Sequence, residues 1–551
     1  MWQCPNCGAN VADCTDSCIV CGYQERHIGR MTGSTTRAGS WKRIIIYDQE
    51  VNSIITMKNL VIVTTMALIT IVSLFLNSCT QQPKTQYKGE PNNVIVYEAS
   101  EKLNAVTDYN AEGLHPDAFN VSIISHEFSN GTGTIVFSSG VKEIGSFAFK
   151  GCGCLTSITI PKFVRAIGSF AFEGCSGLRS IVIPENVESI EPSAFVGCSG
   201  LARIDVNYEN TNYDSRNGCN AIVESSSNIL IAGCQTTVIP NSVVAVGDYA
   251  FDDCTTLTSI KLPKSVTSIG CYAFQGCSNV ASIEVDSGNV CFDSRNGSNA
   301  IIKTATNTLV VACKNTIIPT SVTSIGNDAY RTHPDISSVD IPNSVTSIGD
   351  AAFEGCSDLT NMVIPGSVTN VGIYVFLDCK SLTNVTISSN LSSIGDGMFK
   401  GCTSLSTLIV PGFVTRIEDD AFNGCSGLTH IKLPGSVTSI GYGAFHDCSN
   451  LVSINIPASV TNIGEEAFYG CLSLTDIAIP KSITKIGRYA FDRCDRLKKI
   501  RVNWRQPPSV YSDTFVEFNF DSCSLIVPRG SEELYKKTYP WSEFKNIKPA
   551  V

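Results

Sequence analysis

The 551-residue sequence is poor in charge and lacks the motifs on which most enzymes depend. Only 16% of its residues are charged, and its formal net charge is −10. A protein that binds nucleic acid would show a basic stripe, so this composition argues against nucleic-acid partners. The sequence contains no Gly-x-Ser-x-Gly elbow, no His-Glu-x-x-His helix, no P-loop and no dinucleotide fingerprint. We therefore expect no enzyme activity.

What the sequence does contain is a repeat of 23 residues. An aromatic residue marks each copy from Phe149 to Phe491, and ten of the twelve steps between these aromatics are 23 residues, whereas the other two are 56. After each aromatic, the spacing Leu-x-x-Ile-x-Ile predicts a short strand with one face buried. A proline ends this strand in most copies, and Ser-Val-Thr-Ser-Ile-Gly predicts a second, shorter extended piece. A fixed period in the twenties is typical of a solenoid in which each repeat forms one turn, or rung.

Several copies are nearly identical, among them residues 257–279 and 428–449, which read Leu-Thr-Ser-Ile-x-Ile-Pro-x-Ser-Val-Thr-Ser-Ile-Gly-x-x-Ala-Phe-x-Gly-Cys-Ser with few changes. This text resembles the BspA-like leucine-rich repeat family of bacterial surface antigens, over roughly residues 130–550. The resemblance implies a mainly β leucine-rich repeat solenoid with terminal caps. It also implies a surface protein that binds an extracellular protein or a component of host or other cells.

Twelve of the 25 cysteines lie three residues after the marker aromatic, from Cys152 to Cys494, and His333 takes the thirteenth place. Side chains at one phase of a solenoid stack in parallel, which is a poor geometry for disulfide bonds. We expect a ladder of small, buried, free thiols, in preference to a metal or redox ladder.

The first 22 residues carry two Cys-x-x-Cys pairs, Cys4 with Cys7 and Cys18 with Cys21. Four thiolates in this arrangement can bind a structural Zn²⁺ tetrahedrally, and we predict a zinc ribbon. The pattern resembles the short ribbons at the N-terminus of many bacterial membrane proteins. Because the ribbon needs reduced thiolates, this end of the chain is expected in the cytosol.

Residues 57–80 predict a membrane anchor of one of two kinds. Residues 60–76 are almost wholly apolar, and basic residues precede them, as expected for a transmembrane helix with a cytosolic N-terminus. Alternatively, Leu76-Asn77-Ser78-Cys79 resembles a bacterial lipobox, in which case Cys79 is lipidated and residues 1–56 are absent from the mature protein. A buried globular helix is a third interpretation. Both leading interpretations export the repeats.

The rest of the chain divides by composition and period. Terminal caps are expected because an open solenoid end exposes core and unpaired strand edges. The expected segments are a linker at 23–56, a tether at 81–93, an N-terminal cap at 94–137, the solenoid at 138–503 and a C-terminal cap at 504–551.

The two long steps contain inserts, residues 207–240 and 286–319, which align with each other at an offset of 79 residues. Each insert has two apolar runs separated by a polar turn, which predicts a small β-hairpin on one edge of the solenoid. Each also contains Asp-Ser-Arg-Asn-Gly, at 214–218 and 293–297. We interpret this motif as a tight turn rather than a ligand or Ca²⁺ loop.

One outward residue of each predicted strand varies freely along the row from Thr159 to Arg501, with neither a carboxylate cluster nor an aromatic stripe. Such a row is more typical of a protein-contact surface than of a sugar or nucleic-acid site. The leading hypothesis is a membrane-anchored, exported, adhesin-like binding protein. The alternatives are a structural envelope scaffold and a single-pass sensor with a cytosolic zinc ribbon.

Overall fold

The computed structural model describes residues 2–3, 10–11, 91–388, 391–516 and 518–550. The four predicted zinc ligands, the linker, the anchor with Cys79 and most of the tether lie outside these ranges, and they remain predictions. Within the described ranges, no helix has the length and apolar character needed to cross a bilayer. Near the N-terminus, β1 (Trp2–Gln3) and β2 (Asn10–Val11) form an antiparallel pair.

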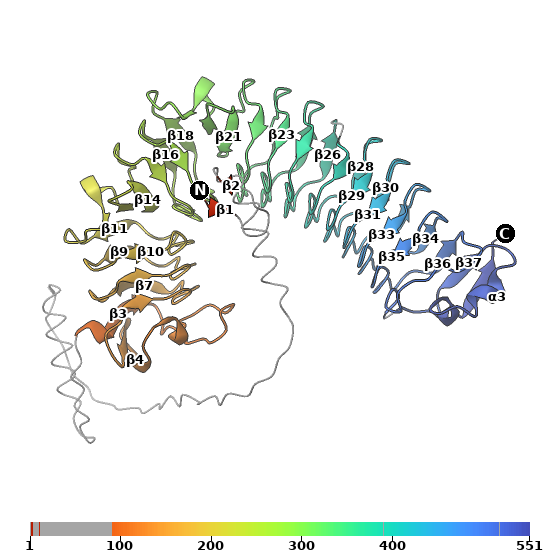
Figure 1. Ribbon diagram of the computed structural model, residues 1–551, viewed down its shortest axis with the longest axis horizontal. Coiled ribbons are helices and arrows are strands. Elements are labelled where there is room, and N and C mark those ends of the chain that lie inside the picture. The colour runs from red at the N-terminus through yellow and green to blue at the C-terminus, as the bar shows by residue number, and fades with distance from the viewer. Residues whose placement is uncertain (1, 4–9, 12–90, 389–390, 517, 551) are drawn as a thin grey trace, which may run out of the picture.

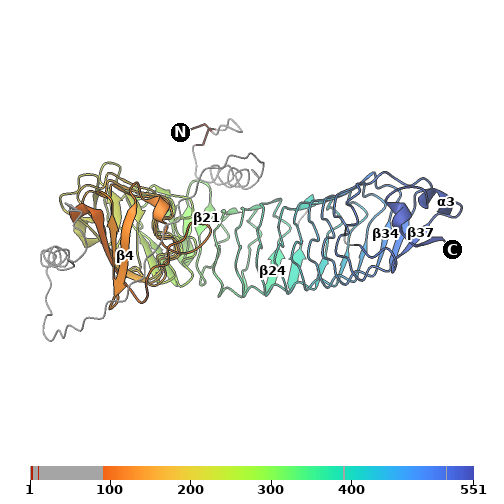
Figure 2. The ribbon, with the colours of Figure 1, turned by 90° about the horizontal axis from the view of Figure 1, so that it is seen from below.

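The repeats stack into a β-solenoid that curves into an arc, and its coils lie side by side in the second view (Figures 1 and 2). Each regular rung contributes a longer and a shorter strand, which pair in parallel with their counterparts in the next rung. Ile431 lies opposite Ile454, for example, because one 23-residue period makes one rung. The solenoid expected from the period is confirmed.

The longer strands follow the Ile-x-Ile pattern, with inward residues buried and outward residues mostly exposed. They are β7 (Leu155–Thr159), β9 (Ser180–Ile183), β11 (Arg203–Val206), β16 (Ser259–Leu262), β18 (Ser282–Val285), β24 (Asn361–Ile364), β26 (Asn384–Ile387), β28 (Thr407–Ile409), β30 (His430–Lys432), β32 (Ser453–Asn455), β34 (Asp476–Ile479) and β36 (Lys499–Val502).

The shorter strands have two residues each and come just before the glycine corner. They are β6 (Glu143–Ile144), β8 (Ala166–Ile167), β10 (Ser189–Ile190), β15 (Ala245–Val246), β17 (Ser268–Ile269), β22 (Ser324–Ile325), β23 (Ser347–Ile348), β25 (Asn370–Val371), β27 (Ser393–Ile394), β29 (Arg416–Ile417), β31 (Ser439–Ile440), β33 (Asn462–Ile463) and β35 (Lys485–Ile486).

The core is a set of columns that run along the solenoid. From Tyr330 to Phe491 the marker aromatics are stacked with ring centroids 5.0–5.6 Å apart. This separation follows from the spacing of neighbouring strands. Each ring therefore covers the next, and no single rung could bury its aromatic alone.

The cysteine ladder is confirmed, and it has a function in the packing. In ten rungs the buried thiol donates a hydrogen bond, 3.0–3.3 Å long, to the carbonyl of the marker aromatic in the preceding rung. All the described cysteines are free. Burial raises the pKa of Cys356 to about 12, which keeps the thiol protonated as a donor.

The inserts form the predicted hairpins, but these do not stand apart from the coil. In the first insert β13 pairs antiparallel with β14, and β14 pairs in parallel with β15 of the next rung. The insert thus makes a shortened rung of its own. The insert elements are β12 (Tyr213–Asp214), η3 (Arg216–Gly218), β13 (Ile222–Glu224), β14 (Ile229–Ala232), β19 (Phe292–Asp293), η4 (Arg295–Gly297), β20 (Ile301–Lys303) and β21 (Thr308–Val311).

In these shortened rungs Gly233 and Ala312 occupy the place of the marker aromatic. The Gly233 N–H donates to the Ala250 carbonyl, just as a regular aromatic bonds to the alanine of the next rung. A Cβ on Gly233 would lie 2.1 Å from the Phe251 ring, so this position requires glycine. The aromatic column is therefore interrupted at each insert.

Both ends of the solenoid are closed. At the N-terminus β3 pairs antiparallel with β5 and with β7, which covers the first strand edge. At the C-terminus β37 and β38 extend the sheet, and Phe515 stacks on Phe491 at 5.8 Å. The cap elements are η1 (Pro91–Asn93), β3 (Val94–Ala99), η2 (Pro116–Ala118), β4 (Ile123–Ser129), β5 (Thr132–Phe137), β37 (Ser524–Val527), α3 (Glu532–Tyr535), η5 (Trp541–Glu543) and β38 (Asn546–Pro549).

Candidate binding surfaces

The outward side of the longer strands, which we call the strand face, carries exposed aliphatic residues at one repeated position. Elsewhere in the row this position holds polar or charged residues, apart from Ala478. The aliphatic members are Val182, Val238, Ile317, Val363 and Ile409. Val238 and Ile317 belong to the shortened rungs, so the row continues through both inserts. No two of these residues lie in adjacent rungs, so they form spaced apolar points along the strand face instead of one continuous patch.

The rung that contains Ile409 is the most apolar part of the strand face. Ile409 is 87% exposed and Phe413, four residues further on, is 65% exposed. In most copies a serine stands at the position of Phe413. A large aromatic beside an exposed isoleucine is the type of anchor that dominates protein interfaces.

A polar ladder beside the shorter strands stabilises the rungs against one another. The hydroxyls of Thr438, Thr461 and Thr484 each donate to the carbonyl of the matching residue one rung earlier, at 3.0–3.2 Å. Such bonds between rungs hold the strand face in one geometry, so binding requires little ordering of the main chain.

A row of half-buried aromatics lies two residues before the marker aromatics, and the sequence reasoning missed it. The rings of Phe147 and Phe170 stack with their centroids 5.4 Å apart. The Tyr249 centroid lies 6.4 Å from that of Phe170 and 5.1 Å from that of Tyr272. All four residues have left-handed φ angles of 57–63°. Because each ring packs against its neighbours, we interpret the row as part of the framework. In the sequence, this row can be recognised as a second aromatic residue two positions before the marker aromatic.

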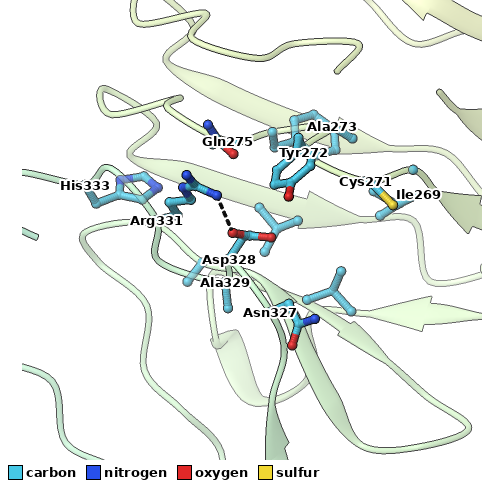
Figure 3. Close-up of a pocket in the computed structure, with 15 residues that line it drawn as sticks. Ile269, Cys271, Tyr272, Ala273, Gln275, Asn327, Asp328, Ala329, Arg331 and His333 are labelled. Carbon is cyan, nitrogen blue, oxygen red and sulfur yellow. Dashed lines mark hydrogen bonds and ion pairs between the residues drawn. The ribbon is translucent and has the colours of Figure 1, made fainter. Parts of the chain in front are cut away.

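A small hollow of about 90 Å³ lies where the second shortened rung meets its neighbours (Figure 3). It forms because Ala312 replaces an aromatic, and its lining includes Tyr272, Gln275, Arg331 and His333. The volume is enough for roughly three water molecules. The hollow is therefore too small to bind a macromolecule.

Arg331 is the centre of an ionic cluster at this hollow. Its guanidinium lies 2.9 Å from Asp328 and 2.8 Å from Glu354, and it covers the Tyr272 ring at 5.6 Å. Burial raises the pKa of both carboxyls, and Arg331 opposes that shift. Asp252 also interacts electrostatically with Arg331, and burial raises its pKa to about 8.

The two Asp-Ser-Arg-Asn-Gly motifs form tight turns. In the first motif Arg216 donates Nε and Nη2 to the two oxygens of Asp214, at 2.7 and 2.6 Å. Asn217 has a left-handed φ of 58°, and the second motif repeats this arrangement. The aspartate that a Ca²⁺ loop would need is thus bound to arginine. No group of three histidine, cysteine or acidic residues able to hold a metal occurs within the described ranges.

Comparison with known proteins identifies a family. The model of the BspA type leucine-rich repeat region, in six copies, matches residues 121–224, 231–310, 307–429 and 415–539. Among curated proteins, none matches this sequence.

The similar solved structures include the following three bacterial proteins. A leucine rich cell surface protein of Faecalibacterium prausnitzii A2-165 is 29% identical, covering 57% of this chain and 76% of its own, with a TM-score of 0.39. A leucine-rich repeat protein of Bacteroides ovatus ATCC 8483 is 26% identical, covering 78% and 99%, with a TM-score of 0.40. One from Eubacterium ventriosum ATCC 27560 is 19% identical, covering 68% and 95%, with a TM-score of 0.44. The family ranges span most of the sequence, and the chain belongs to the BspA type leucine-rich repeat family.

Proposed function

We propose that this protein is an exported scaffold that binds a protein partner outside the cell through its strand face. The function is binding without catalysis. Export through the segment at 57–80, either as a transmembrane span or as a lipid anchor on Cys79, would place the solenoid at the cell surface, as the family resemblance implies.

The observation that carries the proposal is the exposed aliphatic row on a capped, rigid coil. Ile409 and Phe413 provide a central anchor, and Val363, two rungs earlier, is a second exposed aliphatic residue on the same face. Protein interfaces combine a few such anchors with a polar surround. The serine, threonine and asparagine side chains of the neighbouring strands supply that surround.

The test is binding of the purified chain to immobilised extracellular matrix proteins and to whole cells. We expect saturable binding, and the double substitution Ile409→Ser with Phe413→Ser should weaken it at least tenfold, since anchors of this type contribute about 2 kcal/mol or more. Thr438→Ser is the matched control, because Thr438 lies beside a shorter strand and not on the strand face.

Two outcomes would contradict the proposal. The first is an absence of binding to any cell or matrix component, and the second is equal binding by the double variant. Unchanged adhesion together with altered cell shape on deletion of the gene would favour an envelope scaffold instead.

We further propose that Cys4, Cys7, Cys18 and Cys21 hold a structural Zn²⁺ on the cytosolic side, provided that the mature protein retains its N-terminus. Intact mass and zinc content of protein extracted from native membranes test this directly. A full-length chain with one zinc supports the ribbon and keeps a sensor role open. A lipidated chain that begins at Cys79 removes the ribbon from the mature protein.

A further inference from the structure

A hollow of about 480 Å³ opens beside β16, where the first shortened rung meets the next regular rung. Its lining includes Val238, Phe251, Leu257, Ser259 and Lys261. A volume in this range suits a bound ligand. Since Val238, Ser259 and Lys261 are outward residues of the strand face, the hollow is continuous with that face.

The hollow exists because the shortened rung supplies no longer strand. β16 pairs with β18 in a sheet of two strands, and in the described part of the chain no strand pairs with its other edge. The insert residue nearest this edge, Val238, donates its N–H to the Cys219 carbonyl within the insert. Its N–H is therefore not available to β16.

The register shows which main-chain groups of β16 face the hollow. The Asp286 N–H donates to the Leu262 carbonyl of the preceding rung at 2.9 Å. The N–H groups of alternate residues in each longer strand therefore point toward the preceding rung. By the same register the N–H of Lys261 points toward the first insert. Among the described residues, none accepts a hydrogen bond from it. An unpaired strand edge of this kind is a template for an added strand.

The second insert caps an edge of the opposite kind, the edge of β18 that faces the following rung. There the Asn299 side chain accepts a hydrogen bond from the Ile283 N–H at 2.6 Å and donates to the Ala281 carbonyl at 2.9 Å. These two bonds cap the edge of β18. The edge of β16 that faces the first insert has no such cap among the residues that the structure describes, so the N–H of Lys261 is free there.

The floor of the hollow reaches the core. Phe251 is 3% exposed and Leu257 is 4% exposed, whereas the matching residues of the rungs from Phe353 to Leu474 are fully buried. An apolar side chain from outside can therefore contact core residues here.

The charges at the rim are balanced. Lys261 and Asp286 are the charged side chains of the lining, and they have opposite signs. Asp286 Oδ1 already accepts the Gly288 N–H at 2.8 Å. This distribution complements an uncharged segment better than an acidic or a basic one.

We propose that this hollow binds an extended, uncharged peptide segment of the protein partner, which pairs with the Lys261 main chain and places one apolar side chain against Phe251 and Leu257. The inference deepens the proposed function and rests on it. Main-chain hydrogen bonds supply part of the affinity in this mode, and the side-chain pocket supplies specificity.

The probe is a fluorescein-labelled peptide with the sequence of residues 155–161, Leu-Thr-Ser-Ile-Thr-Ile-Pro, which is an uncharged longer strand of this chain. Fluorescence anisotropy with the full chain should show saturable binding. Lys261→Pro, which removes the N–H, should weaken binding about tenfold. Lys261→Ala keeps the N–H and should bind as the parent does.

Matched variants separate binding from folding. Ser259→Trp should block the hollow, whereas Ser282→Trp, at the same register on β18, should not. Lys261→Pro should leave the melting temperature nearly unchanged, because that N–H bonds to no other strand. Glu284→Pro should lower it, because Glu284 pairs with Lys261 from the following rung and its N–H points back to β16.

The absence of saturable peptide binding would overturn the proposal, and so would binding that neither Lys261→Pro nor Ser259→Trp weakens. If capture of an extracellular partner depends on Ile409 and Phe413 but is unaffected by Ser259→Trp, the proposed function stands and this inference fails. If the peptide binds as expected but no extracellular partner is found, the proposed function is the part that fails.

Discussion

Replacing Asp252 by asparagine should stabilise the solenoid, and the gain should increase as the pH rises from 4 to 8. The carboxyl is only 7% exposed, and its Oδ1 has no hydrogen-bond donor among the described residues. Burial raises its pKa from 3.8 to about 8, and the neighbouring Asp253 adds to the shift while Arg331 opposes it. The native state therefore keeps this proton to a much higher pH than the unfolded chain does.

The sign and the size of the effect follow from that difference. Between the two pKa values the native state binds one proton more than the unfolded state, so the free energy of unfolding falls as the pH rises. The loss is about 1.4 kcal/mol per pH unit, or about 3 kcal/mol between pH 5 and pH 7. Asparagine cannot ionise, so the Asp252→Asn variant should not show this loss.

Urea unfolding of the parent and the variant at pH 5, 6 and 7 measures the effect. The difference in the free energy of unfolding should widen with pH in favour of Asp252→Asn. The exposed Asp340→Asn is the control, and its stability should follow that of the parent. If the free energy of unfolding changes with pH in the same way for the parent and for Asp252→Asn, the assignment of a buried, protonated carboxyl is refuted.

Three further substitutions test the packing. Cys425→Ala removes a buried thiol and its 3.0 Å hydrogen bond, so the free energy of unfolding should fall by about 1–2 kcal/mol, and an unchanged urea midpoint would contradict the ladder. Gly233→Ala places a Cβ against the Phe251 ring and should cost about 1–3 kcal/mol by the same assay, whereas a neutral effect would show that the shortened rung has spare room. Arg216→Ala breaks the pair with Asp214 and should lower the melting temperature by about 1–2 °C, and Ca²⁺ should not restore it.

The regular rungs could be predicted from the sequence because each rung contacts only its two neighbours, which repeat the same residue types. Each column repeats one residue type at one phase, so the position of Phe445 or Cys448 in one rung predicts its neighbours in the next. The strand, the proline stop and the thiol ladder all follow from that phase.

The irregular rungs could not be predicted in the same way. Gly233 replaces an aromatic within a segment of a different length, so its place in the column is visible only after β14 is seen to pair with β15. The hollow beside β16 and the free N–H of Lys261 depend on that pairing. The cluster around Arg331 likewise depends on contacts between rungs across the second insert.

The aromatic row was missed for a different reason. Phe147 and Phe170 adopt a left-handed conformation that favours glycine or asparagine, so local preference does not point to aromatics there. The second column lies at the corner before the marker aromatics, away from the strand row.

We propose that the strand face contacts a protein outside the cell. The most direct test places a photoreactive p-benzoylphenylalanine at the position of Ile409 in the chain on intact cells, with the same group at the position of Thr438 as the control. Irradiation followed by mass spectrometry identifies the contacts of each position. We expect one extracellular protein to be crosslinked from position 409 and not from position 438. Equal crosslinking from both positions, or crosslinking from position 438 alone, would contradict it.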